Sequence, residues 1–188
     1  FLGLILRISN EFCFKRRAMG TYQLIHLNVV RPLGTFSADT AETRYFFEQL
    51  PKVFADADSY DGLRWHNHGI RLADESYLDL PDVFGLKTEW PNNPHVMTMA
   101  GWESAKALHA FSYRMASHVE GMRRLRHWVD RSEGATMVMF WAKRGHRVSL
   151  EEGWERLVRL REEGPSKEAF NLKQRYDAPD AEPGSVAA

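Results

Sequence analysis

The chain has 188 residues, 44% of them hydrophobic, which is enough for one sizeable core and favours a single domain. Its 25 Lys and Arg residues balance 25 Asp and Glu residues, so the basic excess typical of nucleic-acid-binding proteins is missing. The single cysteine, Cys13, excludes an internal disulfide framework and a cysteine-based zinc site. These features predict a cytoplasmic protein that binds no nucleic acid.

The chain opens with FLGLILRIS, which is apolar but far shorter than a membrane span. Its basic residues, Lys15 to Arg17, follow the apolar stretch, whereas a secretory signal has them in front. We therefore expect no contact with a membrane. Residues 1–18 are predicted to be an upstream segment, non-native or poorly ordered, in front of a single domain over residues 19–176.

The first predicted strand is TYQLIHLNVV, residues 21–30, which ends at Arg31-Pro32. Side chains alternate along a strand, so two sets face opposite ways. One set is the more apolar and is expected to meet helices: Gln23, Ile25, Leu27 and Val29. The other set is expected to face away from them: Tyr22, Leu24, His26 and Asn28.

A first helix is predicted over about residues 40–57, because apolar residues recur at helical spacing after a capping pattern at Asp39 and Glu42. Pro51 should kink or divide it. A second strand is predicted over 60–72 after an Asp-Gly turn. Residues 74–94 contain three prolines and no sustained period, which predicts a long loop.

The second half of the chain repeats the alternation of strands and helices. Strands are predicted over 95–102 and 135–142, with one long helix over 103–130 between them. Ser149 and Glu152 form a capping box for a last helix that Gly164-Pro165 ends. The polar tail 177–188 is predicted to be disordered.

The order strand, helix, strand, strand, helix, strand predicts an α+β fold, namely a ferredoxin-like antiparallel sheet with helices on one face and an additional C-terminal helix. Two helices cover only one face of such a sheet. The face that carries His26 and Asn28 should then be hidden against a second copy of the chain, which predicts a homodimer, a dimeric α/β barrel, with a ligand cavity between the sheets.

Four segments carry a family resemblance: YQLIHLN, GWESAKALHAFSYRMASHVEGMRRLRHW, MVMFWAKRGH and SLEEGWERLVRLREEGPSKEAFNL. Over about residues 21–172 the chain resembles an uncharacterised bacterial family, a domain of unknown function in the dimeric α/β-barrel superfamily, related to antibiotic-biosynthesis monooxygenases. The resemblance implies a cofactor-independent enzyme for an electron-rich aromatic or polyketide substrate. Haem-degrading relatives imply an alternative, in which Asn28, Trp102 and His118 would surround haem.

His26, Asn28 and His118 are the predicted catalytic residues, because an imidazole can act as a general base near neutral pH and an amide can form hydrogen bonds to a ligand. For His26 and Asn28, a polar patch against the partner chain remains an open alternative. For His118, a structural hydrogen bond and a metal or haem ligand remain open alternatives. The predicted substrate-binding residues are aromatic, flexible apolar or cationic groups expected near the cavity: Tyr22, Trp65, Met97, Met99, Trp102, Arg114 and Trp141.

His66 and His68 lie on one face of the second predicted strand and could bind a metal, but the sequence offers no third ligand, so we predict no metal site. The sequence also lacks a phosphate-binding glycine loop and a serine-hydrolase elbow. The predicted function is a monooxygenase-like, cofactor-free enzyme for an apolar or aromatic small molecule. The alternatives are a haem-binding or haem-degrading protein with His118 as ligand, and a non-catalytic ligand-binding module.

Overall fold

The computed structural model describes residues 20–80 and 94–180, which form one five-stranded sheet and four α-helices. In chain order the elements are β1 (Tyr22–Val30), α1 (Ala41–Asp58), β2 (Leu63–Arg71), β3 (Tyr77–Leu78), β4 (His95–Trp102), α2 (Ala105–Arg114), α3 (Ala116–Leu125), β5 (Met137–Lys143) and α4 (Leu150–Glu163). The predicted upstream segment, most of the predicted loop and most of the predicted tail lie outside the described residues.

All strand pairs in the sheet are antiparallel, and the strands lie side by side in the order β3-β2-β4-β1-β5. The four long strands begin and end within three residues of the predicted ones. Two units of strand, helix and strand are thus interleaved so that β1 and β4 occupy the centre. This arrangement confirms the predicted α+β, ferredoxin-like fold.

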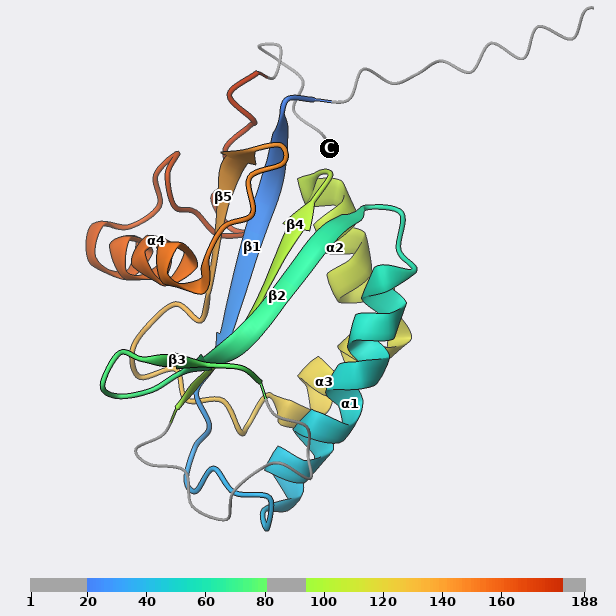
Figure 1. Cartoon of the computed structure of the whole chain (residues 1–188), viewed down its shortest axis with the longest axis vertical. Coiled ribbons are helices and arrows are strands. Elements are labelled where there is room, and N and C mark those ends of the chain that lie inside the picture. The colour runs from blue at the N-terminus through green and yellow to red at the C-terminus, as the bar shows by residue number, and fades with distance from the viewer. Residues whose placement is uncertain (1–19, 81–93, 181–188) are drawn as a thin grey trace, which may run out of the picture.

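The sheet separates two helical layers (Figure 1). On one face, which we call the α1–α3 side, Leu24 packs with Leu108 and Phe111 of α2 and with Ala57 of α1. On the other face, the α4 side, Ile25 packs with Leu157 and Leu160 of α4. Neither face is therefore bare.

This arrangement corrects the predicted position of the first strand's side chains. Tyr22, Leu24, His26 and Asn28 were expected on a face without helices, but Leu24 belongs to the core beneath α1 and α2. The helices α1–α3 cover the face that was expected to pack against a second chain. The opposite face is covered by α4, whose position the capping pattern did not reveal. His26 and Asn28 consequently lie beneath helices of their own chain.

The C-terminal helix packs closely against the centre of the sheet. The Ser149 side chain caps α4 by accepting a hydrogen bond from Glu152 N at 3.2 Å, as the sequence predicts, and Gly164 ends it with a positive φ of 81°. At Gly153 the helix comes so near that an added Cβ would lie 3.0 Å from the Met99 sulfur and 3.3 Å from a Leu27 methyl group. The glycine thus allows α4 to seal this face.

The long helix predicted over 103–130 is two helices. Met115 has an extended backbone, with φ −74° and ψ 118°, and ends α2 while it begins α3. The apolar stripe that predicted one helix continues across the break, but Val119 and Met122 of α3 are partly exposed instead of buried. By contrast, α1 continues through Pro51 as one helix. Within the described residues, no helix is long and apolar enough to cross a membrane.

Candidate functional site

The α1–α3 side of the sheet has two apolar clusters. Leu24, Trp102 and Met139 pack at one end with α1 and α2, and Ile70 and Val96 pack at the other end with α1. Between these clusters the sheet presents polar side chains. Together with one residue of α3 they form what we call the histidine belt: His26, Asn28, His66, His68, Thr98 and His118.

The strand register places the belt residues in two rows across the sheet. His26 on β1 pairs with Ala100 on β4, and Ala100 pairs with His66 on β2. The next row, two residues along each strand, consists of Asn28, Thr98 and His68. Directly paired residues on antiparallel strands project to the same side, so all these side chains face the helical layer.

The belt residues on the two central strands are only partly buried. His26, Asn28, Thr98 and Ala100 lie on the two central strands beneath the helical layer, and each keeps part of its surface accessible. Accessible polar groups deep in a fold are a common feature of ligand sites, which makes the belt our candidate site.

His118 is held by the break between α2 and α3. Its Nδ1 lies 3.0 Å from the Ser112 carbonyl oxygen, an acceptor that a continuous helix would have used for the backbone N–H of Ala116. Since a carbonyl can only accept, Nδ1 carries the proton, and in the neutral ring Nε2 is a free lone pair. The predicted structural hydrogen bond therefore exists, and it leaves the second nitrogen available for a ligand.

Both central histidines are uncharged at neutral pH. Burial, helped by the charge of nearby His118, lowers the pKa of His26 from 6.5 to about 4. Burial also lowers the pKa of His118, although its hydrogen bond to Ser112 opposes the shift. Because the two imidazoles influence each other's charge, the pair can accept one proton, but a second proton is disfavoured.

The depressed pKa of His26 predicts an acid-dependent loss of stability. An unfolded chain binds this proton below about pH 6.5, whereas the folded chain binds it only near pH 4, so stability is retained above pH 6.5 and falls as the pH drops toward 4. When the pH is lowered from about 7.5 to about 5, the free energy of unfolding of the wild type should fall by about 2 kcal/mol more than that of His26→Gln. Urea unfolding at the two pH values measures this difference. The exposed His109→Gln is the control, and equal pH dependence in both variants would contradict the assignment.

The other two belt histidines lie under Phe54 of α1. The Phe54 ring is nearly parallel to both imidazoles, with its centroid 5.0 Å from His66 and 4.8 Å from His68. His66 Nε2 lies 3.0 Å from the Asp58 carboxylate. The Nδ1 atoms of both histidines are buried and have no hydrogen-bond partner among the described residues. No group of three metal-binding side chains occurs in those residues either.

Several predicted substrate-binding residues lie elsewhere. Trp65, Met97 and Met99 belong to the core on the α4 side and do not share a space with His26. Trp65 Nε1 donates to Gln23 Oε1 at 3.0 Å, so its polar atom is used within the core. The sequence correctly predicted which residues share a face of each strand. It placed these three residues on the same side of the sheet as His26, whereas they lie on the opposite side.

The remaining predicted residues lie at the edges of the site. Trp102 is buried between the belt and the end of the sheet, and Trp141 donates a hydrogen bond to the Tyr176 carbonyl at 2.7 Å. Arg114 is exposed in the last turn of α2, where its positive charge interacts favourably with the helix dipole. Thr98 and Ala100 were not predicted as site residues, although they pair with Asn28 and His26. Their alternation along the predicted strand 95–102 could have identified them.

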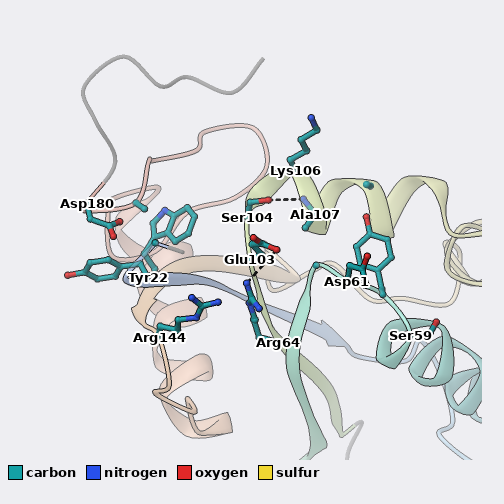
Figure 2. A pocket seen from close by; sticks show the side chains of 16 residues that line it. Tyr22, Ser59, Asp61, Arg64, Glu103, Ser104, Lys106, Ala107, Arg144 and Asp180 are labelled. Carbon is teal, nitrogen blue, oxygen red and sulfur yellow. Dashed lines mark hydrogen bonds and ion pairs between the residues drawn. The ribbon is translucent and has the colours of Figure 1, made fainter. Parts of the chain in front are cut away.

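A second hollow lies at the end of the sheet near the start of α2, and Tyr22 contributes to it (Figure 2). Its volume is about 780 Å³, and Arg64 forms an ion pair with Glu103 at 3.5 Å within it. Asp180, which accepts a hydrogen bond from Thr21 N at 2.7 Å, borders it on the other side. Acidic and basic groups alternate here without a net charge, and buried Leu24 and Trp102 separate it from the belt. The belt is the better candidate for chemistry.

Comparison with known proteins places most of the chain in a single family. Residues 23–185 match a family described as a domain of unknown function, DUF3291. No curated protein matches the chain. The match covers every described strand and helix except the first residue of β1, so the belt lies entirely within the family's domain.

Solved structures of low similarity share the general fold. A putative antibiotic biosynthesis monooxygenase from Nitrosomonas europaea has 9% identity and a TM-score of 0.42, with 69% of this chain and 96% of that chain covered. SnoaB, a cofactor-independent oxygenase from Streptomyces nogalater, has 12% identity and a TM-score of 0.37, covering 70% and 98%. The protein PA3566 from Pseudomonas aeruginosa has 8% identity and a TM-score of 0.41, also covering 70% and 98%. Such values carry no information on a reaction.

Proposed function

The chain belongs to the DUF3291 family, a domain of unknown function, and we propose that it is a small-molecule enzyme that takes a proton from an aromatic hydroxyl group in the histidine belt. The observation that carries this proposal is His118, whose Nδ1 is fixed on the Ser112 carbonyl and whose Nε2 is left as a free lone pair. An imidazole oriented by a hydrogen bond at one nitrogen is the usual form of a general base at the other.

The surroundings of His118 support an uncharged, mostly apolar substrate. Burial keeps His26 and His118 neutral at physiological pH, and Asn28 and Thr98 offer hydrogen bonds without charge. Phe111, whose ring centroid lies 5.4 Å from that of His118, supplies an aromatic wall. An aromatic ring with a hydroxyl group matches this combination of apolar walls and few polar anchors.

The proposed step is a proton transfer. The O–H bond of the ligand breaks, an N–H bond forms at His118 Nε2, and the products are a phenolate and an imidazolium ion. An electron-rich phenolate can then react with dioxygen so that one oxygen atom enters the ring and the other leaves as water, giving a quinone without an external reductant. This is the cofactor-free, monooxygenase-like reaction that we propose for the protein, and self-association of the chain remains a separate prediction.

Para-nitrophenol provides a direct test, because its phenolate absorbs visible light whereas the neutral phenol does not. At about pH 6, where the free compound is mostly protonated, binding to the wild type should increase the phenolate band. His118→Gln should reduce this increase by about tenfold or more, since a glutamine cannot accept the proton. His109→Gln, at an exposed position of α2, should behave like the wild type.

Two results would overturn the proposal. One is a phenolate band of equal size in His118→Gln and the wild type. The other is a Soret band on titration with haemin that disappears in His118→Ala, which would support the haem alternative.

A further inference from the structure

The Asp58–His66 pair points to a second acceptor in the same site. We infer that the belt takes a flat ligand with two separate O–H or N–H donors, one directed at His118 and the other at His66, which Asp58 holds in position. This inference rests on the proposed function and adds to it the chemical class of the ligand. It also assigns a role to residues that the proton-transfer step does not use.

Asp58 fixes the orientation of the His66 ring. The distance of 3.0 Å between His66 Nε2 and a carboxylate oxygen of Asp58 requires a proton on Nε2, since the carboxylate is an acceptor. In the neutral ring, Nδ1 is then a lone pair, and this atom is buried without a hydrogen-bond partner in residues 20–80 and 94–180. A buried acceptor without a partner is costly, and a donor supplied by a ligand would remove the cost.

The strand register sets the span between the two ends of the site. His26 and His66 flank Ala100 in one row, and neighbouring strands lie roughly 4.8 Å apart, so the outer two backbones are separated by roughly 10 Å. Ala100 is the smallest side chain of the row and is partly accessible. A ring that reaches both ends would lie over Ala100, with one edge toward the His26 and His118 end and the other toward His66.

The hydrogen-bonding capacity of these groups selects the ligand. His118 Nε2 and His66 Nδ1 are both lone pairs in the neutral rings, and lone pairs accept hydrogen bonds but cannot donate them. Phe54 lies parallel to His66 and closes the site on the helical side with an apolar face. A ring with donors at opposite edges satisfies both acceptors, whereas a ring with one donor leaves His66 without a partner.

Hydroquinone, kept reduced with ascorbate, and phenol are suitable probes because they differ only in the second hydroxyl group. In NMR titrations of the full chain, hydroquinone should bind at least about fivefold more tightly than phenol, the effect of one added net hydrogen bond. A gain of twofold or less, which two equivalent ends give by statistics alone, would overturn the inference. The nitrogen resonance of His66 Nδ1 should shift with hydroquinone and not with phenol.

Two variants separate this inference from the proposed function. Asp58→Ala removes the surface carboxylate and should abolish the advantage of hydroquinone while phenol binds as before; Glu48→Ala, an exposed carboxylate elsewhere on α1, should retain it. His66→Phe should do the same as Asp58→Ala if it folds. An unchanged advantage in Asp58→Ala overturns the inference alone. If neither probe binds the wild type and para-nitrophenol shows no phenolate band, the proposed function falls as well.

Discussion

Replacing Gly101 by alanine is expected to lower the free energy of unfolding by about 2–4 kcal/mol, although only one methyl group is added. Gly101 lies on β4, and its missing side chain makes room for a hydrogen bond that crosses this strand. Trp65 Nε1 of β2 donates to Gln23 Oε1 of β1 at 3.0 Å. An added Cβ would lie 2.4 Å from the donor and 2.9 Å from the acceptor, so the two side chains would have to separate.

The separation would affect more than one hydrogen bond. Gln23 is buried and also donates to the His146 carbonyl at 2.7 Å, which fixes the turn after β5. Trp65 is buried in the core on the α4 side, where a displaced indole ring would find no free space. Urea unfolding followed by circular dichroism measures the change.

Gly121→Ala is the matched control for this prediction. The chemical change is the same, but the added methyl group meets nothing within 4 Å, and the position is inside a helix. Alanine in place of a helical glycine should stabilise the protein by about 0.5–1 kcal/mol. The two variants should therefore change the free energy of unfolding in opposite directions. A small effect of Gly101→Ala, as expected on a solvated strand, would show that the crossing hydrogen bond does not form.

Leu157→Ala is expected to lower the free energy of unfolding by about 2–5 kcal/mol. Leu157 is fully buried at the centre of α4, in the cluster that includes Ile25 and Met99 of the sheet. Its truncation would leave a cavity between α4 and the central strands, and the tight approach at Gly153 restricts how far the helix can move to fill it. Chemical unfolding again measures the effect.

Glu155→Ala tests the opposite surface of the same helix. Its side chain is exposed, so the change should stay within about 0.5 kcal/mol. If α4 did not cover the sheet, Leu157→Ala would be as mild as this control. A strong dependence of the wild-type unfolding midpoint on protein concentration would instead indicate that a second chain contributes to the core of this face.

The sequence predicted the four long strands well because their alternation is local, whereas the two-residue strand β3 lies in the predicted loop. It did not predict which face of β1 meets which helices, since Leu24 and Ile25 are both apolar and both become fully buried. Two helices seemed available for one face, and α4 was left without a place, so a second chain was expected to cover the other face. If the position of α4 had been known, His26 and Asn28 could have been assigned to the α1–α3 side of the sheet.

The belt shows a similar limit. His26, Asn28 and His118 were predicted from residue type, and the structure gathers them on one side of the sheet. The hydrogen bond from His118 to Ser112 depends on the break at Met115, which no glycine or proline marks. Helical periodicity continues through residues 115–122, so the break is visible only in three dimensions.

The extended backbone at Met115 interrupts the helical hydrogen bonds between α2 and α3. It uncouples α3 from α2, and α3 has no fully buried residue of its own. A short segment with so little buried surface opens at lower cost than the sheet. A movement of α3 away from α2 would break the hydrogen bond between His118 Nδ1 and the Ser112 carbonyl, so the orientation of the proposed base depends on how α3 packs.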